Sequence, residues 1–162
     1  ISKPIGWSFG EKPEIGAAIS SVKVSWPANS YDATWYAVEN RWLLSQRGVS
    51  NLSTSGIHLG PTTSLILLVA ITDSIYKDKI GGVTPYSQTV GVGRGYVMRD
   101  GLAIAANWSR PSGDQGTTWT TVAGDEIKFS PGQIWIALTD KTPVFTPVAM
   151  AINEDATPPA AK

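Results

Sequence analysis

The sequence predicts an all-β fold, either an antiparallel sandwich or a partly open barrel built from hairpins. Its 162 residues include 16 glycines and 11 prolines, which separate short runs rich in valine, isoleucine, threonine and aromatic residues. Turn signals recur about every eight to twelve residues, a spacing typical of sandwiches and barrels. The best candidate helix covers residues 36–47, but aromatic residues crowd its start and no capping residue precedes it. We therefore expect strands there too.

Three segments of the first half are interpreted as strands. The first, SSVKVSW, alternates apolar residues on one face and stops at Pro27. Residues 33–47 form two strands joined by a turn near Glu39 and Asn40. Residues 64–72, SLILLVAIT, are continuously apolar, which predicts a central strand that is covered on both faces.

Two hairpins are predicted in the second half. Asp100-Gly101 lies between two β-like segments, and Asp-Gly is among the strongest short-range hairpin signals. Pro131 presets the first central position of a type II turn, and Gly132 supplies the positive φ that the second position requires. We expect this second turn to join EIKF to QIWIAL as a hairpin.

Gly91, Gly93 and Gly95 raise the question of a phosphate-binding loop. A dinucleotide fingerprint needs G-x-G-x-x-G between a strand and a helix, whereas the spacing here is G-x-G-x-G and a hairpin signal follows. The Gly-Lys-Ser/Thr of a P-loop does not occur in the sequence. Glycine within a strand more often marks a bulge or the close approach of another backbone, which is the interpretation we adopt.

Composition excludes several classes of function. The chain has no cysteine, and its 13 basic side chains balance 13 acidic ones. Disulfides and thiolate chemistry are therefore absent. Without an excess of positive charge, non-specific electrostatic binding to nucleic acid is not expected. The apolar run Leu65–Ile71 is too short for a helix that spans a bilayer. The first residues show no signal peptide, although an export signal could have been processed.

The sequence from GRGYVMRDGLAIAANWSRPS to TTWTTVAGDEIKFSPGQIWIALTD resembles the C-terminal domain of YerB-like bacterial lipoproteins, a family catalogued as a domain of unknown function. The match is carried by short motifs in fixed order: Gly93 and Gly95, Arg99-Asp100-Gly101, Asn107-Trp108-Ser109-Arg110, Gly124-Asp125-Glu126-Ile127, and Pro131-Gly132-Gln133 with Trp135. It covers roughly residues 7–139.

The resemblance implies an extracytoplasmic protein of the bacterial surface, tethered to the membrane through an N-terminal lipid that lies outside this chain. Family members usually carry another domain before this one. On this basis residues 1–20 are a connecting segment from that absent domain, residues 21–140 are the all-β domain, and residues 141–162 are a Pro/Ala-rich tail. Asn51 stands near a position where family members often have histidine, so no role of that histidine transfers.

No catalytic set, metal site or cofactor site is predicted. Ser74 and Lys77 satisfy S-x-x-K, but that chemistry needs a helix, and these residues follow an apolar strand. His58 is the sole histidine, which makes a zinc site improbable, and no nucleophile elbow accompanies it. A surface or locally hydrogen-bonded histidine is the simpler interpretation.

The seven tryptophans are the feature of the sequence that most suggests a role beyond the fold itself. Three lie in apolar alternation and are assigned to the core: Trp35, Trp42 and Trp135. Trp108 and Trp119 have polar neighbours and could line an exposed groove for a glycan or a protein, with Arg110 available for a carboxylate. They could equally pack across a hairpin as a cross-strand pair.

The leading functional hypothesis is a non-enzymatic interaction module of a cell-envelope lipoprotein, with an envelope or membrane protein as its partner. A second hypothesis is a peptidoglycan- or glycan-binding module that uses Trp108, Trp119 and Arg110. A third is a hydrolase whose site is completed by the missing N-terminal domain.

Overall fold

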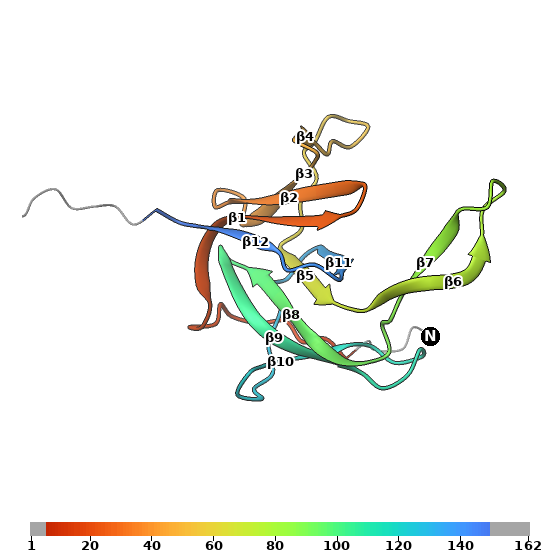
Figure 1. The fold of residues 1–162 in the computed structure, drawn as a ribbon. Coiled ribbons are helices and arrows are strands. Elements are labelled where there is room, and N and C mark those ends of the chain that lie inside the picture. The colour runs from red at the N-terminus through yellow and green to blue at the C-terminus, as the bar shows by residue number, and fades with distance from the viewer. Residues whose placement is uncertain (1–5, 150–162) are drawn as a thin grey trace, which may run out of the picture.

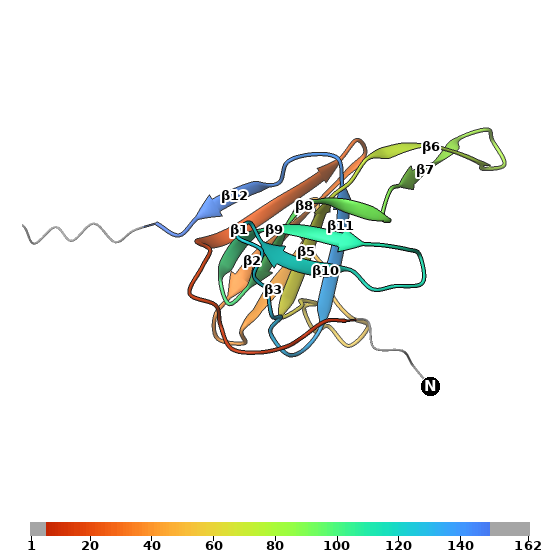
Figure 2. The ribbon, with the colours of Figure 1, turned by 90° about the horizontal axis from the view of Figure 1, so that it is seen from below.

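The computed structural model describes residues 6–149 and confirms an all-β fold. A large sheet curls into a half-barrel, and a separate two-stranded sheet projects from it (Figures 1 and 2). The strands are β1 (Ala17–Trp26), β2 (Asn29–Tyr36), β3 (Arg41–Gln46), β4 (Val49–Ser50), β5 (Thr63–Leu68), β6 (Ile71–Lys77), β7 (Val83–Ser87), β8 (Gly91–Arg99), β9 (Leu102–Arg110), β10 (Thr118–Thr121), β11 (Ile134–Thr139) and β12 (Val144–Pro147).

The large sheet has the strand order β11-β5-β8-β9-β1-β2-β3-β4, with β10 beside β9 and β12 beside β1. Its curl depends on β1, which changes partners along its length. Ala17 and Ala18 pair with β9, whereas the strand pairs with β2 from Ser21 onward. The far end of β1 thereby reaches β11, where the Trp26 indole N–H donates to the Leu138 carbonyl at 2.7 Å.

Two predicted turns are confirmed, and both use left-handed backbone. The turn between β2 and β3 contains Asn40 at φ 51°, a conformation that asparagine tolerates better than most residues. Between β8 and β9, Asp100 and Gly101 have φ values of 51° and 74°. Positive φ at both central residues is the requirement of a type I′ hairpin turn, and Asp-Gly meets it.

β5 is the central strand that its apolar sequence predicts. Ile66 belongs to a buried cluster with side chains of β1, β2 and β3. Leu65 and Leu67 point to the opposite face and join a second buried cluster with β8, β9 and β10. Both faces of β5 are therefore covered.

The predicted hairpin between EIKF and QIWIAL is wrong. Residues 126–129 make only isolated bridges with other segments, and β11 runs parallel to β5, with Ile134 opposite Thr63. A buried strand such as β5 needs a neighbour on each edge to satisfy its backbone groups, and β11 provides that neighbour. Gly132 has the positive φ expected of it, at 129°, but residues 131–132 form a bend rather than a hydrogen-bonded turn.

The three tryptophans assigned to the core have different environments. Trp42 is fully buried, and Trp35 is partly buried against it, with ring centroids 5.0 Å apart. Trp135 is 39% exposed, so its assignment to the core is wrong. β11 is the last strand of the sheet order, and within the described residues no strand pairs with its outer edge. An apolar pattern along such an edge strand does not imply burial.

Candidate functional site

The structure brings Trp108 and Trp119 together but buries both. They are register partners across β9 and β10, and each is only 3% exposed. The Trp108 indole N–H donates to the Arg94 carbonyl at 3.0 Å. The prediction of an exposed groove at these rings is wrong, and the cross-strand pair is what the structure shows.

Glycines of β8 make the room for these indole rings. A Cβ placed on Gly93 would lie 2.6 Å from the Trp108 ring. A Cβ on Gly95 would lie 3.2 Å from the Trp119 ring and 2.2 Å from the Ile66 carbonyl oxygen. The close backbone approach expected of a glycine-rich strand is thus found at Gly95. Gly93 lies opposite Trp108, and the Trp119 ring of β10 reaches Gly95, so these alternating glycines were the sequence signal that the two tryptophans would be buried.

Arg110 holds a loop through three of its five N–H donors. Its Nε and Nη2 atoms donate to the carbonyls of Gln115 and Gly113 at 2.8 and 2.6 Å, and Nη1 donates to Thr89 Oγ1 at 3.2 Å. The guanidinium therefore orders residues 111–117. The other two N–H groups donate to no acceptor within residues 6–149, so the availability of Arg110 for a ligand carboxylate stays a prediction.

Arg99, which the sequence marks only as part of a family motif, is a buried clamp. Its side chain is 2% exposed and pairs with Asp100 at 2.5 Å. It also donates to the carbonyls of Lys128 and Gly10, at 2.7 and 3.0 Å. One guanidinium thus fastens the N-terminal segment and the segment before β11 to the β8–β9 turn. A buried charge needs such partners, so its role is structural.

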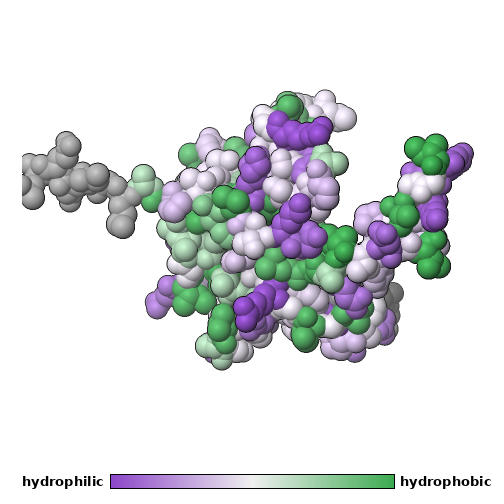
Figure 3. Space-filling view, in the orientation of Figure 1, coloured by the Kyte–Doolittle hydropathy of each residue, from purple (hydrophilic) through white to green (hydrophobic). Residues whose placement is uncertain are grey.

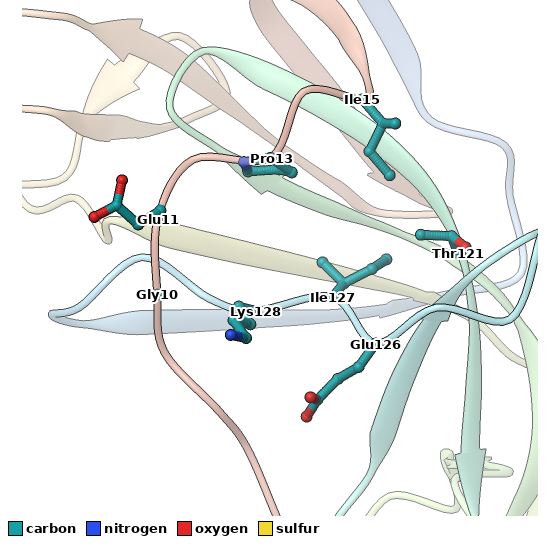
Figure 4. Close-up of a pocket in the computed structure, with 8 residues that line it drawn as sticks. All are labelled: Gly10, Glu11, Pro13, Ile15, Thr121, Glu126, Ile127 and Lys128. Carbon is teal, nitrogen blue, oxygen red and sulfur yellow. The ribbon is translucent and has the colours of Figure 1, made fainter.

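A hollow of about 370 Å³ lies beside the segments that Arg99 joins (Figure 4). It is lined by Gly10, Glu11, Pro13, Ile15, Thr121, Glu126, Ile127 and Lys128. In Figure 4 the carboxylates of Glu11 and Glu126 point in different directions. Glu126 also accepts a hydrogen bond from Ser8 Oγ at 2.7 Å. These carboxylates do not converge on one point, so the hollow does not form an acid/base pair.

The other polar candidates have local roles. Ser74 lies on β6, where its hydroxyl accepts from the Tyr76 N–H at 3.1 Å, so Ser74 and Lys77 lack the helical arrangement of S-x-x-K chemistry. His58 Nε2 lies 2.6 Å from the Leu44 carbonyl oxygen, a local hydrogen bond as expected. Across residues 6–149, no three side chains of metal-binding type gather into a possible metal site. Nor does that part of the chain contain a helix long and apolar enough to cross a membrane.

The most exposed apolar side chains belong to the hairpin formed by β6, β7 and the loop between them. We call this hairpin, residues 71–87, the arm. The arm projects from the half-barrel in both ribbon views (Figures 1 and 2). Ile75 and Ile80 are 89% and 94% exposed. Tyr76 and Tyr86 are exposed as well. Figure 3 shows hydrophobic and hydrophilic residues alternating along the projection.

The tip of the arm is ordered by its own hydrogen bonds. The Asp78 carboxylate accepts from the N–H groups of Ile80 and Gly82 at 2.9 and 2.8 Å. The Asp78 N–H donates to the Gly82 carbonyl at 2.8 Å. β6 and β7 pair only with each other within the described residues. The arm is therefore an ordered hairpin whose apolar side chains are left exposed by the rest of the described fold.

Comparison with known families decides what this fold is. The profile described as "Protein of unknown function (DUF3048) C-terminal domain" matches residues 22–136. The chain belongs to this family. Its fold resembles the crystal structure of the YerB protein from Bacillus subtilis, with a TM-score of 0.64 and 16% sequence identity. That similarity covers 85% of this chain and 46% of the YerB chain, so this chain spans about half of YerB. No curated protein sequence matches it.

The DUF3048 match includes the arm, the Arg99 clamp and the pair formed by Trp108 and Trp119. The short motifs that suggested the family from sequence are therefore features of the fold in this chain. Gly93 and Gly95 admit the tryptophans, and Asp100-Gly101 makes the turn. These two DUF3048 motifs therefore have a structural role in this chain.

Proposed function

We propose that this DUF3048 domain is a non-enzymatic interaction module of a bacterial cell-envelope lipoprotein, and that the arm binds an envelope protein. The observation that carries the proposal is the exposure of Ile75 and Ile80 on an element that projects from the body. A lone two-stranded hairpin is marginally stable in water, because it has no core of its own. Exposed apolar side chains gathered on one element mark an interaction site.

The charges of the arm favour a protein partner over an anionic membrane surface. Lys77 and Lys79 are balanced by Asp73 and Asp78. Membrane-binding surfaces normally add basic side chains to the apolar ones, and here no net positive charge is present. The partner would cover the isoleucines with an apolar groove or pair with an open edge of the arm, as in β-augmentation.

The envelope location is part of the same proposal. It is supported by the resemblance to YerB-like lipoproteins. In such a protein the domain would face membrane-anchored partners, and the arm would be the element that extends farthest toward them. This arrangement needs no catalytic residue in the domain.

Photo-crosslinking tests the arm directly. A photoreactive residue replaces Ile80, or Val122 as a control that is also exposed but lies outside the arm. Each chain is incubated with detergent-solubilised envelope membranes of the bacterium that encodes it. We expect one discrete crosslinked protein from position 80, competed by the unmodified chain and not by the Ile75→Ser/Ile80→Ser chain. Equal crosslinking from position 122, or tight binding of the chain to protein-free anionic vesicles, would contradict the proposal.

A further inference from the structure

A cleft of about 330 Å³ lies at the outer edge of β11, where the end of the β1–β2 hairpin and the strands that follow it reach that edge. It is lined by Trp26, Asn29, Tyr31, Gln46, Asn51 and the backbone stretch from Trp135 to Leu138. The cleft and the arm are formed by different strands. It is therefore independent of the function proposed above.

Three aromatic rings form one continuous wall of this cleft. Trp26 stacks on Tyr31 with ring centroids 5.7 Å apart and an interplanar angle of 28°. Trp135 meets Tyr31 nearly edge to face at 6.3 Å. The hydrogen bond from Trp26 to the Leu138 carbonyl fixes the orientation of its indole. Tyr31 is buried beneath the two tryptophans, so the wall is rigid and ends in the exposed ring of Trp135.

The polar side chains of the cleft are amides. Asn29 accepts a hydrogen bond from the Ser30 N–H through its Oδ1 at 2.9 Å, which leaves its amide nitrogen free to donate. Within residues 6–149 the side-chain amides of Gln46 and Asn51 take part in no hydrogen bond of the fold. Each amide can donate and accept at once. None of the side chains that line the cleft is charged.

We propose that this cleft binds a neutral glycan. A sugar ring has an apolar face that suits an exposed indole, and its hydroxyls both donate and accept, as amides do. Binding pockets usually combine apolar walls with a few convergent polar groups, in volumes of about 300–1,000 Å³. The cleft is at the small end of that range, which fits one or two sugar rings. Trp135 would stack on a ring, while Gln46 and Asn51 would bind its hydroxyls.

The alternative occupant is an extended peptide. β11 pairs with β5 on one side, and its other side borders the cleft. A peptide could add a strand there. The amides and the exposed Trp135 favour the sugar, because strand addition would be satisfied by backbone groups alone.

The test is a titration of the purified chain with a neutral tetrasaccharide of β-1,4-linked N-acetylglucosamine, followed by NMR chemical shifts and tryptophan fluorescence. We expect saturable binding with shifts at the Trp26 and Trp135 indoles. Trp135→Ala should weaken binding at least tenfold, and Gln46→Ala several-fold. Tyr86→Ala removes an exposed aromatic of the arm and should change nothing.

The outcomes separate the sugar from the peptide. If Trp135→Ala proves unstable in thermal unfolding, the Gln46→Ala/Asn51→Ala double variant, which leaves the aromatic wall intact, takes its place. No saturable binding at millimolar sugar, or binding that neither variant weakens, overturns the proposal. So does binding of a capped five-residue peptide that shifts the β11 backbone amides when the sugar does not. Neither outcome affects the crosslinking result for the arm.

Discussion

The β8–β9 hairpin and the arm are both antiparallel pairs of consecutive strands, yet they use apolar residues in opposite ways. β8 and β9 lie inside the sheet, and their side chains Val97, Ile104 and Trp108 are buried in the core. β6 and β7 pair only with each other within the described residues, and Ile75 remains exposed. A hairpin sequence therefore does not state whether its apolar face is part of the core or of a binding surface. Its neighbours in the fold decide that.

The largest effect is expected from Gly95→Val on β8. The new side chain would begin 2.2 Å from the Ile66 carbonyl oxygen, a backbone atom that cannot move without disturbing β5. We expect a loss of more than about 3 kcal/mol in the free energy of unfolding, measured by urea denaturation. Gly113→Ala is the control, since nothing lies within 4 Å of its Cβ position. Equal stability of the two variants would show that β8 is not tightly enclosed.

Arg99→Met tests the clamp at the turn of the same hairpin. The substitution leaves the Asp100 carboxylate and the carbonyls of Lys128 and Gly10 without their donor. Removing one partner of a buried pair typically costs about 3 kcal/mol. Lys77→Met removes an exposed cation from the arm and should cost less than about 0.5 kcal/mol. Urea denaturation of both variants measures the difference between the two regions.

The buried Tyr31 is expected to make the free energy of unfolding depend on pH. Burial raises the pKa of Tyr31 to about 12, above its usual value of 10.0. Because the folded state keeps this proton more tightly, its stabilising effect is complete below pH 10 and is lost as the pH rises toward 12. The loss should approach about 1.4 kcal/mol per pH unit. Denaturation between pH 9 and 11.5 should show a shallower decline for Tyr31→Phe than for the wild type.

The smallest effect on stability is expected from Ile75→Ser/Ile80→Ser in the arm. Both side chains are exposed, so their removal should change the free energy of unfolding by no more than about 0.5 kcal/mol. Urea denaturation should give the wild-type midpoint, while the double variant fails to compete with the crosslink from position 80. A large drop in stability would instead mean that the isoleucines contribute to the core.

Local features of the fold could be predicted from sequence, whereas contacts between distant segments could not. Asp100-Gly101 specifies its own turn, and the apolar run that contains Leu65 and Ile66 specifies a covered strand. The partner of β11 is different, because Ile134 pairs with Thr63 from the first half of the chain rather than with the residues beside it. No pattern within QIWIAL encodes that choice.

The candidate sites show the same division. Polar neighbours suggested that Trp108 and Trp119 are exposed, but their burial depends on glycines of the adjacent strand. Apolar alternation suggested that Trp135 is buried, but its strand ends the sheet. The exposure of a tryptophan on a strand is set by the residues opposite it and by the position of the strand in the sheet.

The parallel pairing of β5 with β11 also determines when the outer edge of β5 becomes covered during synthesis. β5 is made early, but the strand that covers its outer edge follows only after β6 to β10 have been made. Until then a continuously apolar strand has an open edge, which is the kind of segment that pairs with other nascent chains. A polypeptide halted before Ile134 would retain that edge permanently. The synthesis of β11 therefore closes an edge that would otherwise promote aggregation.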